Sequence, residues 1–173
     1  MVKILDCTIR DSGYETNWDF EDKFVFDLMK NSNKKNIQFF EIGYRNHIDK
    51  EDKGKFYNCT PELLKPFYKE KGELKLGIMV DTTRYCEADF LGADKDYIDF
   101  IRIAGRSEKI PQTLEIAENL HKKGYTIFIQ LMDVSNIDTN GYLNLLAWEN
   151  KNIVESLILV NLLMIKPGTS KPP

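Results

Sequence analysis

Short apolar runs alternate along the chain with longer segments in which apolar residues recur at helical spacing. The runs have the length and β-branched content of buried strands, whereas the longer segments place their apolar residues on one face of a helix. This alternation favours parallel strands joined by crossover helices, and therefore an α/β fold. The predicted strands cover residues 2–7, 37–43, 74–80, 100–104, 126–132 and 157–162.

Helical patterns lie between these strands. In the first of them Phe24, Leu28 and Met29 share one face, which is typical of a helix packed on a core. Thr60 precedes Pro61 as a capping residue precedes a first-turn proline, so a helix is expected to begin there. The predicted helices cover residues 20–31, 61–69, 111–122 and 141–150, with a weaker pattern at 85–91.

The absence of two glycine motifs narrows the choice of α/β folds. No Gly-x-Gly-x-x-Gly follows the first strand and no Gly-Lys-Ser/Thr loop occurs, so dinucleotide and phosphate-loop folds lose their main support. A (β/α)8 barrel fits better, but it needs eight strands and typically about 250 residues. The 173 residues supply six predicted strands, so we expect a TIM-type barrel truncated to about six β/α units.

This expectation divides the chain into a partial barrel at residues 1–163 and an irregular tail at 164–173. The tail is polar and rich in proline, which does not suit a packed element. A truncated barrel would leave the edges of its first and sixth strands unpaired. We therefore expect a homo-oligomer, or completion of the barrel by another chain.

Composition excludes several classes of partner. The net charge of -3 and the absence of a basic cluster argue against a nucleic-acid partner. No apolar run approaches the roughly 20 residues of a membrane span, and no signal peptide is recognisable, so no membrane partner and a cytoplasmic location are expected. Cys7, Cys59 and Cys86 are odd in number and lack Cys-x-x-Cys spacing, which favours reduced thiols.

Arg10 and Asp11 follow the first predicted strand directly, at the rim where parallel α/β folds build their sites. A carboxylate there can hold a divalent cation while the arginine stabilises a developing enolate oxygen. The alternative is a structural ion pair at the end of a strand.

The string Asp6-Cys7-Thr8-Ile9-Arg10-Asp11-Ser12-Gly13-Tyr14, followed by Asn17-Trp18-Asp19-Phe20, resembles a known amino-terminal signature. It is similar to that of the metal-dependent aldolase and acyl-lyase barrels, which include 4-hydroxy-2-oxovalerate aldolase, hydroxymethylglutaryl-CoA lyase and the isopropylmalate and homocitrate synthases. The aldolase-like branch is the most similar. A second match is Phe40-Glu41-Ile42-Gly43-Tyr44-Arg45.

The resemblance implies a divalent-metal-dependent carbon–carbon lyase or aldolase acting on a small 2-oxo or 2-hydroxy acid through a metal-bound enolate. Asp11 would be a ligand of Mg2+ or Mn2+, and Arg10 would stabilise the enolate oxygen. Glu41 would orient the arginine and the metal shell, or it is a buried acid paired with Arg10 for stability alone. Tyr14 is a candidate to hydrogen-bond a substrate oxygen, or it is loop surface.

Three further residues are candidates for binding the substrate. Arg102 and Gln130 are expected to point inward near the rim, where they would bind a substrate carboxylate or simply fill the barrel as a polar pair. Arg45, at the end of the second match, is placed in the same group.

The sequence also departs from the resembling family. The family holds its metal with a His-x-His pair, which this sequence lacks, and Asn161 stands where a Val-Asp is usual. Of the two histidines, His121 suits a helix end, and His47 either faces the site or is a solvated loop residue. The alternative function is therefore a catalytically inactive half-barrel or an oligomerising module.

Overall fold

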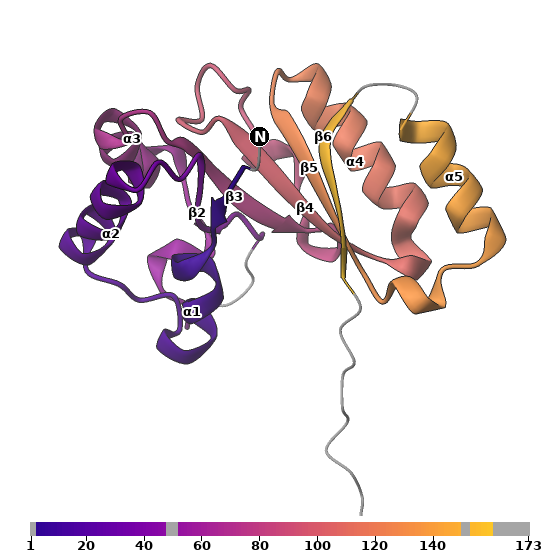
Figure 1. Cartoon of the computed structure of the whole chain (residues 1–173), viewed down its shortest axis with the longest axis horizontal. Helices are drawn as coiled ribbons and strands as arrows, with labels where there is room; N and C mark the ends of the chain where they lie inside the picture. Colours follow the sequence, from indigo (N-terminus) through magenta and orange to yellow (C-terminus); the bar gives the residue numbers. More distant parts are fainter. Residues whose placement is uncertain (1–2, 48–51, 150–152, 161–173) are drawn as a thin grey trace, which may run out of the picture.

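The computed structural model describes residues 3–47, 52–149 and 153–160. Within these ranges six parallel strands form one sheet in the order of the sequence. The sheet is curled into a half-barrel (Figure 1), and the Lys3 Nζ ahead of the first strand reaches Glu155 Oε1 of the last at 2.9 Å. The strands are β1 (Leu5–Asp6), β2 (Phe39–Tyr44), β3 (Lys75–Asp81), β4 (Phe100–Arg106), β5 (Thr126–Met132) and β6 (Val154–Val160).

Helices cover the outside of the curled sheet. Two of them, α2 and α3, lie together at one end of the half-barrel, and α4 and α5 lie together at the other (Figure 1). The helices are α1 (Thr8–Thr16), α2 (Asp22–Lys34), α3 (Pro61–Glu70), α4 (Ile110–Lys122) and α5 (Thr139–Glu149). Short 3-10 turns follow several strands, at η1 (Lys55–Tyr57), η2 (Thr82–Arg84), η3 (Glu87–Asp89), η4 (Ser107–Lys109) and η5 (Val134–Asn136).

Both faces of the central strands are buried, as a parallel sheet with outer helices requires. On the outer face, aliphatic residues of the strands pack under the helices. On the inner face the rings of Phe100 in β4 and Phe128 in β5 stack, and Phe39 of β2 meets both of them edge-to-face. The ring centroids of Phe39 and Phe128 are 5.1 Å apart, and those of Phe100 and Phe128 are 4.9 Å apart. Gly77 of β3 leaves room for this layer, because a Cβ there would lie 2.4 Å from the ring of Phe100.

Most predicted elements are present with shifted ends. The strand at 126–132 has the predicted bounds, and the Thr60 hydroxyl caps α3 by accepting a hydrogen bond from the Leu63 amide at 3.3 Å. The sixth strand begins at Val154, three residues before its predicted start. The tail at 164–173 and Asn161 lie outside the described residues.

Two local predictions were wrong. Residues 8–16, for which no helix was predicted, form α1, whose buried positions are few and include the polar Arg10. A helix with so little apolar surface leaves no strong periodic signal in the sequence. The weak helical pattern at 85–91 contains instead the single 3-10 turn η3, preceded by η2. Among the described helices, none is long and apolar enough to cross a membrane.

Gly43 provides a test of the packing beneath the rim. A Cβ there would lie 2.2 Å from the backbone oxygen of Phe56, which cannot rotate away. We expect Gly43→Ala to lower the free energy of unfolding by about 1–3 kcal/mol, the usual cost of overpacking. Urea denaturation measures this. Gly141→Ala is the control, because its Cβ would meet a side-chain methyl of Ile137 at 2.8 Å, a less severe approach than 2.2 Å to backbone, and because alanine favours the helix in which Gly141 lies. Equal stability of the two variants would contradict the prediction.

Candidate active site

A buried carboxylate binds two arginines on the inner face of the half-barrel. Glu41 of β2 is fully buried, and its Oε1 accepts a hydrogen bond from Arg10 Nε at 2.7 Å. Its Oε2 accepts one from Arg102 Nε at 2.7 Å, and Arg102 Nη2 also contacts Oε1. One carboxylate therefore ties together α1, β2 and β4.

Strand periodicity explains why these groups meet. Side chains two residues apart on a strand lie on the same face, so Glu41 follows Phe39, and Arg102 follows Phe100, one layer nearer the carboxyl ends. Gln130 follows Phe128 in the same way, and its Oε1 accepts a hydrogen bond from Arg102 Nη1 at 2.6 Å. The polar layer of Glu41, Arg102 and Gln130 thus lies directly above the aromatic layer of Phe39, Phe100 and Phe128.

The neighbouring residues Arg10 and Asp11 differ sharply in exposure, because they point in different directions from α1. The side chain of Arg10 is 10% exposed and that of Asp11 is 60% exposed, although Arg10 Nη1 and Asp11 Oδ1 are 2.5 Å apart. The helix begins directly after β1, where the Asp6 carboxylate accepts a hydrogen bond from the Thr8 amide at 2.9 Å. Asp11 therefore faces solvent above the buried Arg10.

Trp18 fixes α1 against the sheet. Its indole Nε1 donates a hydrogen bond to the Arg10 carbonyl at 3.1 Å, and its ring fills the space beside Gly13, where a Cβ would lie 2.1 Å from it. The Gly13 and Trp18 of the sequence signature therefore have a packing role: they set the position of the Arg10 backbone.

Tyr14 lies at the mouth of a pocket near this cluster. Its hydroxyl is 3.0 Å from that of Tyr44, whose pKa is raised by burial and by this hydrogen bond. The guanidinium of Arg10 lies 5.8 Å from the centre of the Tyr44 ring. The pocket holds about 330 Å3 and is lined by four aromatic residues and by polar and basic ones: Tyr14, Trp18, Tyr44, Tyr57, Asn46, Asp81, Lys53 and Arg84.

Arg45 has other partners. It is 1% exposed, and its Nε donates to the Cys59 carbonyl at 2.7 Å while its Nη1 contacts Asp96 Oδ2 at 2.5 Å. Asp96 is itself fully buried and also accepts a hydrogen bond from the Tyr125 hydroxyl. The structure thus brings Arg10, Glu41, Arg102 and Gln130 together, with Tyr14 at the nearby pocket, and places Arg45 in a separate core network.

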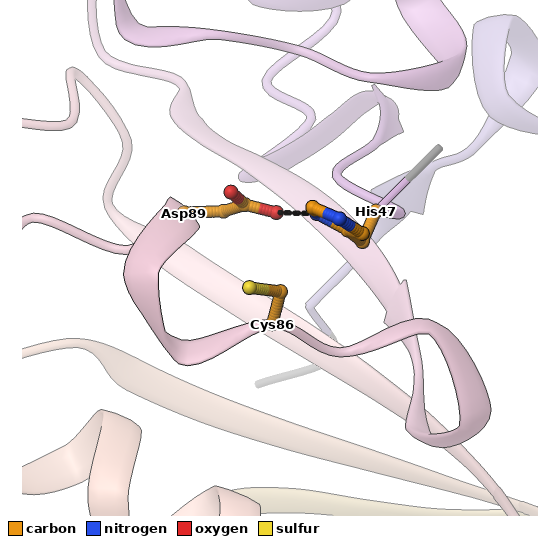
Figure 2. A group of neighbouring side chains, drawn as sticks. All are labelled: His47, Cys86 and Asp89. Carbon is orange, nitrogen blue, oxygen red and sulfur yellow. Dashed lines mark hydrogen bonds and ion pairs between the residues drawn. The ribbon is translucent and has the colours of Figure 1, made fainter. Parts of the chain in front are cut away.

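The described residues do not gather metal ligands around Asp11. Both oxygens of Glu41 already accept hydrogen bonds from arginines, and Asp11 is paired with Arg10. Within the described ranges, three potential ligands meet only at His47, Cys86 and Asp89 (Figure 2). His47 lies past the end of β2 with a side chain 56% exposed, and sequence reasoning missed this group because Cys86 and Asp89 are about 40 residues away from it.

The Cys7 thiol also belongs to this cluster, because its Sγ accepts a hydrogen bond from Arg102 Nη2 at 3.2 Å. Burial, together with the Glu41 carboxylate, raises the pKa of Cys7 to about 11. We therefore expect its alkylation by iodoacetamide to be slow at pH 8 and to rise about tenfold per pH unit up to about pH 10, as the thiolate fraction does. Peptide mapping by mass spectrometry follows the reaction. Alkylation at pH 8 as fast as that of a free cysteine would contradict this assignment.

Two carboxylates that pair with the same arginine give a matched stability test. Glu41→Ala leaves two buried guanidinium groups without their shared partner, so we expect a loss of about 3–5 kcal/mol in the free energy of unfolding. Asp11→Ala removes an exposed partner and should cost no more than about 1 kcal/mol. Chemical denaturation of both variants measures the difference, and similar losses would argue against the central role of Glu41.

Comparison with known proteins bears on this geometry. No protein-family model and no curated protein matches the sequence. A solved structure is similar: the N-terminal domain of a "putative aldolase" from Bacteroides vulgatus, with 31% identity and a TM-score of 0.79 over 91% of this chain and 54% of that one. The chain thus spans about half the length of that protein. It is an α/β chain whose parallel strands curl into a half-barrel like that of the N-terminal domain of an aldolase-like TIM barrel.

Proposed function

We propose that this chain carries the anion-binding part of an aldolase-type active site, which acts on a 2-oxo or 2-hydroxy acid to break or form a carbon–carbon bond. The observation that carries the proposal is the pair of arginines held by Glu41 at the inner face of the half-barrel. The similarity to a domain described as that of an aldolase supports the reaction class.

The charges of the cluster suit an anionic substrate. Arg10 and Arg102 carry two positive charges, and their counterions are the buried carboxylate of Glu41 and the solvent-facing carboxylate of Asp11, which an anionic substrate can displace from Arg10. Burial, the largest single influence, would lower the pKa of Arg10, but Glu41, Tyr44 and Asp11 together outweigh it and the pKa is raised. Both guanidiniums therefore stay charged, and their planar donors match the geometry of a carboxylate or an enolate. Lys53 and Arg84 add positive charge at the adjoining pocket.

In the cleavage direction, a 4-hydroxy-2-oxo acid would lose the proton of its 4-hydroxyl group to a base. The bond between C3 and C4 then breaks, an aldehyde leaves, and the electron pair moves through C3 to the 2-oxo oxygen as an enolate. Arg10 and Arg102 would stabilise this oxygen and the adjacent carboxylate as charge develops. Protonation of C3 completes the reaction. We propose that the Tyr14 hydroxyl, which lies at the adjoining pocket beside that of Tyr44, donates a hydrogen bond to a substrate oxygen.

The family resemblance implies Mg2+ or Mn2+ at Asp11. The described residues do not fit that ion by themselves, because Asp11 is one solvent-facing carboxylate in an ion pair and the sequence has no His-x-His. No step above depends on the metal. The outer edges of β1 and β6 have no strand partner among the described residues, so we propose that a second copy or another chain contributes at this site.

A second candidate function is a half-barrel module without catalysis. The observation that favours it is the isolation of Asp11, around which the described residues gather no second metal ligand. The two functions differ in one assay: the first predicts pyruvate formation from 4-hydroxy-2-oxo acids, measured with lactate dehydrogenase, with and without added Mn2+. Absence of pyruvate in every condition, including at protein concentrations where oligomers form, would favour the module.

Anion binding can be tested apart from turnover. Oxalate is a planar mimic of the pyruvate enolate, and we expect calorimetry to show its binding to the intact chain. Arg102→Lys removes the guanidinium fork but keeps the charge, so we expect about 10- to 100-fold weaker binding, and a similar or larger loss of any aldolase activity.

Arg106→Lys is the matched control, because Arg106 lies on the same strand with a side chain 47% exposed and pairs with Asp133. It should leave oxalate binding unchanged. Equal binding by Arg102→Lys and the unaltered chain would overturn the proposed role of the cluster, and circular dichroism would establish that both variants are folded.

A further inference from the structure

A second group of reactive side chains lies outside the arginine cluster, where the segment after β2 meets the turn η3. We propose that His47, Cys86 and Asp89 bind one zinc ion or a similar borderline-soft transition metal. This site is separate from the magnesium or manganese position that the family resemblance implies at Asp11.

The donor atoms are already close together. One ligand atom from each of the three residues lies within 4.8 Å of the others, and His47 Nδ1 is 3.1 Å from Asp89 Oδ2. A tetrahedral zinc ion, with bonds of about 2.0–2.3 Å, places its ligands about 3.3–3.8 Å apart. Since the ligand atoms lie within 4.8 Å of one another, the thiol needs to approach by at most about 1 Å. Figure 2 shows the imidazole and the carboxylate pointing toward one another above the Cys86 sulfur.

The backbone around these donors is held in place by the rest of the fold. The His47 amide donates to the Arg84 carbonyl at 2.9 Å, and the Asp89 amide donates to the Cys86 carbonyl at 3.1 Å. The Asp89 carbonyl accepts a hydrogen bond from the buried Arg45 at 3.3 Å. Two segments distant in sequence are therefore fixed beside each other before any ion binds, which limits the ordering cost of binding.

The chemistry of the donors selects the metal. A thiolate and a carboxylate supply two negative charges against a divalent cation, and a neutral imidazole completes a nitrogen, sulfur and oxygen set. Mg2+ and Ca2+ take oxygen ligands, so the thiol disfavours them, whereas Zn2+ and Co2+ accept all three donor types. Three protein ligands leave a fourth position for water or another ligand.

An ion in solvent can also reach the proposed metal site. The side chain of His47 is 56% exposed and that of Asp89 is 28% exposed, so an ion can reach the group from solvent. Binding would join the segment after β2 to the turn after β3, and we expect the thermal unfolding midpoint to rise with Zn2+ concentration, because the metal would bind the folded chain preferentially.

The test uses the tag-free full chain, freed of metal by a chelator and kept reduced. We expect calorimetric titration to show one Zn2+ per chain, and Co2+ to give thiolate-to-metal charge-transfer absorption. His47→Ala and Cys86→Ser should each weaken Zn2+ binding by more than about tenfold, since loss of a residue that merely supports a ligand already costs that much. Cys86→Ser should also abolish the charge-transfer band.

Matched controls separate this site from the other histidine, thiol and carboxylate. His121→Ala changes an exposed histidine at the end of α4, Cys7→Ser changes a partly exposed thiol, and Asp11→Ala changes the other candidate metal ligand. All three should bind Zn2+ like the unaltered chain. Absence of stoichiometric Zn2+ binding, or unchanged affinity in both His47→Ala and Cys86→Ser, would overturn the proposal.

Discussion

The buried carboxylate of Glu41 is the interaction on which the inner face of this half-barrel depends. It accepts hydrogen bonds from arginines of α1 and β4 and thereby connects parts of the chain that are 31 and 61 residues away from it. A charge out of water is tolerated only when its partners satisfy it, and here both oxygens are satisfied. The same contacts set the direction in which each guanidinium presents its remaining donors.

The layer beneath the ions makes this arrangement possible. The rings of Phe100 and Phe128 stack, Phe39 meets both edge-to-face, and Gly77 supplies the space that Phe100 occupies. This aromatic layer strengthens the electrostatic interactions above it, because apolar rings rather than polar groups lie directly beneath the ions. The aromatic residues that stabilise the fold and the polar residues proposed to bind the substrate therefore lie in adjacent layers of the same strands.

Hydrophobic periodicity was enough to locate the six strands and four of the helices, because buried parallel strands are nearly continuous apolar runs. It failed at α1, which is held by the Arg10 to Glu41 ion pair and by Trp18 rather than by an apolar stripe. The meeting of Arg102 with Gln130 followed from strand periodicity.

Contacts that depend on how loops fold could not be predicted from local sequence patterns. Arg45 ends a strand like a site residue, yet its partner Asp96 lies in a loop 51 residues later, and nothing local in the sequence indicates that pairing. The approach of Cys86 and Asp89 to His47 depends in the same way on how the turns after two strands fold back over the rim.

The unequal exposure of the two carboxylates has an energetic consequence for the cluster. Glu41 pairs with both guanidiniums out of water, whereas Asp11 pairs with Arg10 while facing solvent, so the second ion pair contributes little free energy. An anion that takes the place of Asp11 at Arg10 therefore loses little and adds its own binding free energy to the folded state. The resistance of the fold to heat should then vary with the anions dissolved around it, so that the choice of buffer alone shifts the unfolding temperature.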